Sequence, residues 1–267
     1  AALELIDDLA AIGPLTSTGG GVPFAVLKHN NACGAAIRPT VKEAWEAALA
    51  GDPVSAFGGV LITTATIDKA TAEAIDAIFF EIICAPGYDP EALELLRRKK
   101  NRMILVRKAV PMPTRRYRSA LNGILSQSPD HVVDLPTHMR AATSKAATAE
   151  QLRDLTFANV LVKHTKSNAI VLARDNHLLA SGAGQTSRVD ALEQAIGKAR
   201  RMGFDPKGAV MASDAFFPFP DCVNIAADAG IAAIVQPGGS IKDQDSIDAA
   251  NARGLAMMMT GNRHFKH

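Results

Sequence analysis

Cysteine is scarce in this chain, and the three that occur, Cys33, Cys84 and Cys222, are far apart. Because no two of them form a Cys-x-x-Cys pair, the sequence supports neither a zinc site nor a disulfide framework. We therefore expect no bound metal, and reduced thiols of the kind found in a cytoplasmic protein.

Aromatic residues and excess charge of one sign are also in short supply. Phe, Trp and Tyr together make up 5% of the 267 residues, and the formal net charge is +2. Proteins that bind nucleic acid usually carry a basic surface or stack bases on aromatic rings. No apolar run approaches the roughly 18 residues of a membrane-spanning helix. The composition therefore argues against both nucleic-acid and membrane partners.

Several catalytic fingerprints are missing as well. The sequence has no Gly-x-Ser-x-Gly nucleophile elbow, no phosphate-binding P-loop and no complete Gly-x-Gly-x-x-Gly motif. These absences disfavour a serine hydrolase and enzymes that bind ATP or NAD. What remains is a chain with 48% hydrophobic and 21% charged residues, the balance of a globular protein with a sizeable core.

Apolar runs alternate with amphipathic stretches along the whole chain, which predicts an α/β fold. The expected helices cover residues 2–11, 41–50, 67–78, 90–100, 149–158, 188–202 and 243–253, with another that ends at 230. The expected strands cover residues 24–27, 60–63, 79–88, 103–106, 160–173, 177–180, 208–213, 231–236 and 255–260. Residues 16–23 read as a loop and 101–147 as an irregular part. We predict a first subdomain over residues 1–147 and a second over 148–267.

The segment SGAGQTSRVD, residues 181–190, reads as a glycine-rich loop that runs into a helix. Gly182 and Gly184 allow a sharp turn, and Ser187 and Asp190 have the spacing of a capping box. Such a loop offers backbone N–H groups and a positive helix end to an anion, with Arg188 beside them. An ordinary turn remains the alternative.

Lys28 and His29 form the pair best suited to catalysis, at the end of the first predicted strand. A lysine cation can stabilise negative charge, and a histidine can move a proton near neutral pH. On the residue pattern alone, a surface lysine beside a hydrogen-bonded histidine is the more common explanation. Lys163 and His164 repeat the pair at a comparable point of the second half, which hints at an internal repeat.

Two further segments could line a binding site. The stretch AFFPFPD, residues 215–221, places three Phe and two Pro before a carboxylate. It suits a flat heteroaromatic ring whose edge is hydrogen-bonded by Asp221, although core packing or a dimer contact would use the same residues. The basic C-terminal segment GNRHFKH is either an exposed tail or folds back on a phosphate.

Seven motifs occur in an order that resembles the transformylase domain of the bifunctional purine-biosynthesis enzyme family. They are KHNNACG, DPVSAFGG, KSNAIVLA, SGAGQTSRVD, SDAFFPFPD, IVQPGGSIKD and TGNRHFKH. That family transfers a formyl group from 10-formyltetrahydrofolate to the 5-amino group of aminoimidazole carboxamide ribonucleotide (AICAR). The resemblance implies two cytidine-deaminase-like α/β subdomains, with mixed sheets sandwiched by helices and without the deaminase zinc. It also implies a homodimer with active sites at the interface.

The resemblance assigns roles to individual residues. The catalytic residues would be Lys28, His29 and His267, with His29 accepting the proton of the attacking amine. Contacts to AICAR would come from Gly58, Glu81, Asn168, Arg188 and Arg263. Contacts to the folate would come from Val189, Phe216, Asp221, Ser240 and Ile241.

Departures from the family pattern leave a second hypothesis open. The chain lacks the Arg-Tyr-Gly-x-Asn-Pro-His-Gln segment that normally opens the domain, and Ala32 replaces a usual Pro. It begins without an initiator Met, which suggests a trimmed start, and without a cyclohydrolase domain, so we do not expect ring closure. The alternative is a truncated or divergent module that binds the nucleotide without catalysis. A zinc deaminase on the same fold is disfavoured, because no His and Cys set can hold the metal.

Overall fold

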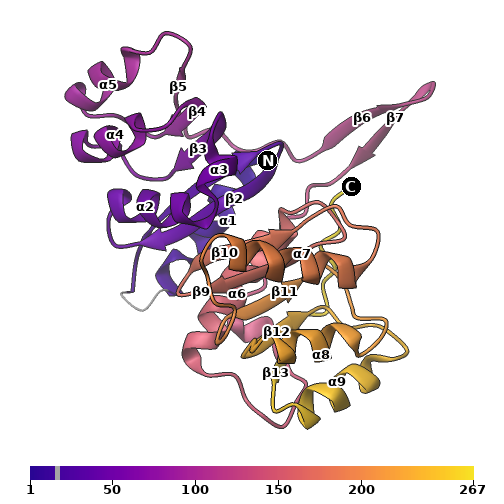
Figure 1. Ribbon diagram of the computed structural model, residues 1–267. Helices are drawn as coiled ribbons and strands as arrows, with labels where there is room; N and C mark the ends of the chain where they lie inside the picture. Colours follow the sequence, from indigo (N-terminus) through magenta and orange to yellow (C-terminus); the bar gives the residue numbers. More distant parts are fainter. Residues whose placement is uncertain (16–18) are drawn as a thin grey trace.

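The computed structural model describes residues 1–15 and 19–267 and has the predicted α/β architecture (Figure 1). The described residues form one mixed 11-stranded sheet and a separate two-stranded hairpin. The order of strands across the sheet is β5-β4-β3-β1-β2-β10-β9-β11-β12-β13-β8. One continuous sheet therefore replaces the separate sheets that we expected.

The elements follow the chain in three groups. The first half contains α1 (Ala2–Ile12), β1 (Val22–Lys28), β2 (Asn31–Arg38), α2 (Val41–Gly51), α3 (Pro53–Ala56), β3 (Gly59–Thr63), α4 (Lys69–Asp76), β4 (Phe80–Ala85), α5 (Pro90–Arg97) and β5 (Met103–Val106). The connecting part contains β6 (Arg116–Ala120), β7 (Gly123–Gln127) and β8 (Arg140–Ala141). The second half contains α6 (Ala149–Lys163), β9 (Ile170–Arg174), β10 (His177–Gly182), α7 (Arg188–Arg201), β11 (Val210–Ser213), α8 (Asp221–Asp228), β12 (Ala233–Gln236), α9 (Asp243–Ala252) and β13 (Ala256–Met259).

The two halves use the same strand connections. In the first, the β1–β2 hairpin is followed by β3, antiparallel to β1, and then by β4 and β5 in parallel. In the second, the β9–β10 hairpin is followed by β11, antiparallel to β9, and then by β12 and β13 in parallel. The equivalent strands β2 and β10 pair antiparallel where the halves meet. The topology is therefore an internal repeat.

The two Lys-His pairs in the sequence do not mark this repeat, so that prediction was wrong. Lys28 ends strand β1, whereas Lys163 ends helix α6. The structural counterpart of the turn at His29 and Asn30 is the turn at residues 175–176, because both join equivalent hairpin strands and both have positive φ angles at their two residues.

Helices cover both faces of the sheet. One face packs against α1 and α6, with Ala25 and Leu27 of β1 in the same apolar cluster. On the opposite face, α2, α4 and α5 cover the first half, where Phe24 and Val26 of β1 point, and α7, α8 and α9 cover the second half. Since successive side chains of a strand point to opposite faces, each central strand contributes to two cores.

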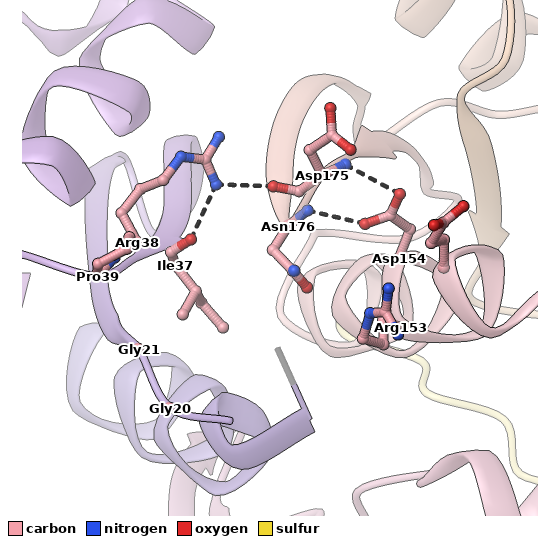
Figure 2. Close-up of a pocket in the computed structure, with 10 residues that line it drawn as sticks. Gly20, Gly21, Ile37, Arg38, Pro39, Arg153, Asp154, Asp175 and Asn176 are labelled. Atoms are coloured by element: carbon pink, nitrogen blue, oxygen red, sulfur yellow. Dashed lines mark hydrogen bonds between the residues drawn. The ribbon is translucent and has the colours of Figure 1, made fainter. Parts of the chain in front are cut away.

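Backbone groups and the side chain of Arg38 join the halves, and Asp154 holds the turn that they contact (Figure 2). Arg38 at the end of β2 donates from Nη1 to the carbonyl of Asp175 at 2.7 Å. The N–H of Ile37 donates to the carbonyl of Asn176 at 3.0 Å. Asp154 of α6 accepts from the backbone N–H groups of Asp175 and Asn176 at 2.9 and 2.8 Å. Burial raises the pKa of the Asp154 carboxyl, and the two hydrogen bonds, which lower this pKa, do not cancel the effect. A cavity of about 420 Å³ lies beside this joint, and its lining shares no residue with the predicted site.

Some predicted boundaries were wrong because the local pattern could not decide them. Residues 160–163 continue α6 instead of starting a strand, and β9 begins only at Ile170. This end of α6 is buried all round, and a continuous apolar run does not distinguish a buried helix from a buried strand. Strand β2 was missed because Ala and Gly, which dominate it, are poor strand formers.

The parts that we expected to be irregular hold more structure than predicted. Of the loop over residues 16–23, residues 16–18 lie outside the described residues, and β1 begins at Val22. Within 101–147, strands β6 and β7 form a hairpin that projects from the rest of the molecule (Figure 1). Strand β8 pairs with β13 of the second half. The division at residue 147 stays a prediction.

None of the helices in the described ranges is long and apolar enough to cross a membrane.

Glycine lets a helix lie directly against a central strand in each half. A Cβ on Gly34 of β2 would lie 1.9 Å from the carbonyl oxygen of Ala48 in α2. A Cβ on Gly182 of β10 would lie 1.8 Å from the carbonyl oxygen of Ala191 in α7. Neither contact leaves room for a methyl group, so any larger residue must push the helix away from the sheet.

We expect Gly182→Ala to lower the free energy of unfolding by about 1–3 kcal/mol, the usual cost of overpacking a core. Urea denaturation measures this change. Gly123→Ala is the matched control, because its Cβ would lie 3.8 Å from its nearest neighbour, the carbonyl oxygen of Ala120. An equal loss in both variants, or no loss in Gly182→Ala, would contradict the close approach of helix and strand.

Candidate active site

A cavity of about 560 Å³ opens in the second half, where the start of β9 and the end of β11 meet the first turns of α7 and α8. Its volume lies within the usual range of small-molecule sites. Six residues that we predicted to bind substrates line it: Asn168, Arg188, Val189, Phe216, Asp221 and Arg263. The structure therefore brings together residues that are almost a hundred positions apart in the sequence.

The glycine-rich loop runs into α7 as predicted. The Ser187 hydroxyl accepts from the backbone N–H of Asp190 at 3.0 Å, which caps the helix at its first turn. Gly203 follows the end of the helix with a φ of +85°, as expected of a C-terminal glycine. This cap fixes Arg188 as the first residue of α7, at the edge of the cavity.

Arg188 is buried, and its guanidinium is held on both sides. Nη1 donates to the Ser213 hydroxyl at 3.0 Å and to the carboxylate of Asp214, which has no exposed surface. Nη2 donates to the side-chain oxygen of Asn168 at 2.9 Å. The amide of Asn168 in turn donates to the carbonyl of Gln185 at 3.0 Å. Arg188 and Asn168 therefore form one rigid polar unit on the cavity wall.

The predicted aromatic wall is present, although one of its residues turns away. Phe216 and Phe219 line the cavity, whereas Phe217 is fully buried in the core. The guanidinium of Arg263 lies 4.8 Å from the centre of the Phe216 ring. Asp221 begins α8 at the end of the wall. The wall thus presents apolar ring faces bordered by a cation and a carboxylate.

Ser240 and Ile241 lie beside this cavity but are not among the residues that line it. They belong to the loop before α9, and Ile241 is fully exposed. The next residue, Lys242, places its Nζ 4.6 Å from the centre of the Phe219 ring. A contact between this loop and a ligand in the cavity stays a prediction.

Lys28, Gly58 and Glu81 gather at a second place, in the first half. The Lys28 ammonium donates to the carbonyls of Phe57 and Gly58 at 2.6 and 3.0 Å. A Cβ on Gly58, whose φ is +68°, would lie 2.9 Å from this Nζ and 3.9 Å from a carboxylate oxygen of Glu81. His29 follows in the exposed turn between β1 and β2. A glycine is therefore needed where the lysine, the loop and the carboxylate meet.

The C-terminal segment runs between the two places and contacts the rest of the protein, although most of its residues are exposed. Its contact with a phosphate stays a prediction. Lys266 donates from Nζ to the carbonyls of His164 and Asn30 at 2.6 and 3.4 Å. Phe265 lines the cavity. The centre of the His267 ring lies 5.5 Å from the centre of the Phe265 ring. Within one chain, however, the described lining of the cavity does not include Lys28, His29 or His267. The predicted catalytic and binding residues are therefore only partly brought together.

Residues that support the site were missed at the sequence level. Ser213 and Asp214 hold Arg188, and their position directly after a buried strand is a signal that could have found them. His264 is buried against Asp130 and Asp134, which come from the part that we expected to be irregular. Nothing in the local pattern pairs residues more than a hundred positions apart.

The three cysteines are free and buried. Burial raises the pKa of the Cys33 thiol to about 11 and that of the Cys222 thiol to about 12, so neither is an activated nucleophile. In the part of the chain that the structure describes, no three His, Cys, Asp or Glu side chains are placed to hold a metal ion. The expectation of a metal-free site stays a prediction.

Known proteins resemble this chain along its whole length. It is 59% identical over 267 residues to the bifunctional purine biosynthesis protein PurH of Bacteroides thetaiotaomicron, and 48% identical over 243 residues to PurH of Aquifex aeolicus. These matches cover 100% and 91% of this chain but 51% and 47% of the relatives. The chain thus spans about half the length of the curated relatives it matches.

Among solved structures, a Thermotoga maritima diaminohydroxyphosphoribosylaminopyrimidine deaminase/5-amino-6-(5-phosphoribosylamino)uracil reductase matches 36% of this chain and 31% of its own. At 19% identity and a TM-score of 0.29, this likeness decides nothing about the fold. The family model described as AICARFT/IMPCHase bienzyme, in contrast, matches residues 1–198. With that match and full-length identity of 59%, the chain belongs to the AICARFT/IMPCHase bienzyme family.

Proposed function

We propose that this chain is a phosphoribosylaminoimidazolecarboxamide formyltransferase of purine biosynthesis, which moves a formyl group from 10-formyltetrahydrofolate to the 5-amino group of AICAR. The observation that carries the proposal is the cavity that gathers Asn168, Arg188, Phe216, Asp221 and Arg263 in a member of this family. The resemblance assigns Asn168, Arg188 and Arg263 to AICAR, and Phe216 and Asp221 to the folate.

The basic side of the cavity suits the nucleotide. Arg263 is exposed at the rim, where its charge can meet a phosphate group. Arg188 and Asn168 are fixed behind it by their mutual hydrogen bond, so they can hold a polar base without reorganising. We assign this side to AICAR, with Gly58 and Glu81 as further contacts.

The aromatic side suits the folate. Phe216 offers a ring face to a flat heteroaromatic system, and Asp221 lies where a carboxylate can accept from its N–H groups. Val189 lines the same cavity, and Ser240 and Ile241 form a loop beside it. We assign these residues to the folate co-substrate.

The chemistry needs a base and a cation near the formyl carbon. We assign His29 as the base that takes the proton from the attacking amine as the new bond to the formyl carbon forms. Lys28 either stabilises the negative charge on the formyl oxygen or assists protonation of the folate nitrogen, whose bond to the formyl carbon breaks so that tetrahydrofolate leaves. The carbonyls of Phe57 and Gly58 orient the Lys28 ammonium. His267 is assigned to the same reaction centre.

A second copy of the chain would complete this site. Lys28 and His29 lie outside the described lining of the cavity in one chain, which favours a homodimer whose active sites combine residues of both subunits. The projecting β6–β7 hairpin exposes Tyr117, Ile124 and Leu125, the kind of apolar surface that an interface covers (Figure 1). We further propose two cytidine-deaminase-like subdomains that divide at residue 147, and a cytoplasmic location, where buried thiols stay reduced.

The test of this function is formyl transfer by the chain itself, measured as tetrahydrofolate formed from 10-formyltetrahydrofolate and AICAR. We expect turnover that requires both substrates and that His29→Ala reduces by at least about a hundredfold, the usual contribution of a general base. His138→Ala is the matched control, because this histidine is exposed in a short 3-10 turn away from the cavity. AICAR binding without turnover would instead favour the non-catalytic module.

Removing the rim charge should weaken nucleotide binding selectively. We expect Arg263→Met to raise the KM for AICAR about tenfold to a hundredfold, since a hydrogen bond to a charged group contributes about 1.5–3 kcal/mol. The KM for the folate should change much less. Arg253→Met is the control, because this exposed arginine pairs with Asp228 beyond the cavity. An equal rise in both KM values would assign Arg263 to the structure of the cavity rather than to the nucleotide.

A further inference from the structure

Three successive residues of the C-terminal segment point in two directions. Arg263 and Phe265 line the cavity, whereas His264 between them is buried in the protein with 3% of its surface exposed. The backbone N–H of His264 donates to the carbonyl of Asp214 at 3.1 Å. Whatever fixes the His264 side chain therefore also fixes the two residues that face the cavity.

Both ring nitrogens of His264 face a carboxylate. Nδ1 lies 2.6 Å from an oxygen of Asp130, and Nε2 lies 2.8 Å from an oxygen of Asp134. A neutral imidazole has one N–H, so its other nitrogen would set a lone pair against a carboxylate. Two donated hydrogen bonds require the doubly protonated, charged ring.

The two carboxylates are themselves anchored. Asp134 is 1% exposed and also accepts from the side-chain amides of Asn159 in α6, at 3.0 Å, and Asn262, at 2.6 Å. Lys163 at the end of α6 has its Nζ 4.0 Å from Asp130 and donates to the carbonyl of Val132 at 2.7 Å. The ring of His264 is thus tied to the connecting part of the chain and, through it, to a buried helix.

The charges around the ring favour its protonated form. Burial by itself would lower the pKa of His264, but the hydrogen bonds and negative charges of Asp130 and Asp134 outweigh it and raise the pKa to about 9. The other charged groups of the cluster are Lys163 and Asp8, which pair with each other at 2.8 Å. His164 also contacts Asp8, and burial lowers its pKa. The stability that the raised His264 pKa contributes is complete below about pH 6.5 and is lost as the pH rises through about 9.

We propose that the charged ring of His264, clamped between Asp130 and Asp134, is a positioning device that holds Arg263 and Phe265 against the cavity and thereby sets the affinity for the nucleotide. The inference rests on the proposed function, because AICAR is the ligand that we assign to Arg263. His264 touches no substrate in this proposal and acts through its two neighbours.

The kinetic test replaces the ring with an uncharged amide, as His264→Gln. We expect the KM for AICAR to rise about tenfold, the effect of losing one charge-assisted hydrogen bond, with little change in kcat or in the KM for the folate. In the unaltered chain the KM for AICAR should rise above about pH 9, and this rise should be absent from His264→Gln. An unchanged KM in the variant, or the same pH dependence in both, would overturn the proposal.

Asp76→Asn is the control for a general loss of stability. It breaks the pair between Asp76 and the buried side chain of Arg102 in the first half, so it should lower stability without changing the KM for AICAR. If His264→Gln fails to fold, Asp130→Asn tests the same clamp at a residue whose side chain is 40% exposed. A normal KM for AICAR in that variant would also count against the clamp.

Two measurements separate this inference from the proposed function. NMR of ¹⁵N-labelled histidine should show both His264 nitrogens protonated at pH 7, and a neutral ring would overturn the clamp. Hydrogen exchange of the peptide over residues 262–267 should be faster in His264→Gln than in the unaltered chain, with no substrate present. A failure to convert AICAR would contradict the proposed function. Equal exchange rates in the two proteins would overturn the positioning role of His264, whether or not AICAR is a substrate.

Discussion

The structure depends on one constraint: the central strands of the sheet are buried on both faces. α1 and α6 cover one face, and two groups of helices cover the other, so chemistry has room only at the ends of strands. Lys28 ends β1, Asp214 follows β11, and Asn168 precedes β9. Because β9 and β11 are antiparallel, the start of one and the end of the other meet at the same edge, and the cavity opens there.

Among the described residues, three buried charged side chains near the site have oppositely charged partners within hydrogen-bonding distance. Arg188 is matched by Asp214, Lys163 by Asp8, and His264 by two carboxylates. Removing one partner of such a pair leaves an uncompensated buried charge, which typically destabilises a protein by about 3–5 kcal/mol. These pairs consequently fix the register of the segments that carry them. They also hold part of the cavity wall in place, because Arg188 and the two neighbours of His264 line the cavity.

Equivalent positions of the internal repeat serve different purposes. The turn after β1 carries His29 and is exposed, whereas the equivalent turn after β9 is held by Asp154 and Arg38 at the joint between the halves (Figure 2). The same backbone geometry thus presents an exposed histidine in one half and a structural contact in the other. The half with the exposed turn carries Lys28 and His29, while the other half supplies the cavity.

The sequence by itself determined the α/β class, most element positions and six of the residues that line the cavity, because hydrophobic periodicity, caps and ordered motifs are local signals. It located the loop from Gly182 to Arg188 and the aromatic wall near Phe216. It did not reveal the extent of α6, the strand β2, or the single sheet, because a fully buried apolar run and a small-residue strand carry no distinguishing period. Tertiary structure alone decided that Arg188 needs Asp214 and that His264 needs Asp130 and Asp134. Those contacts join distant parts of the chain, and only the packed sheet and helices bring them within hydrogen-bonding distance.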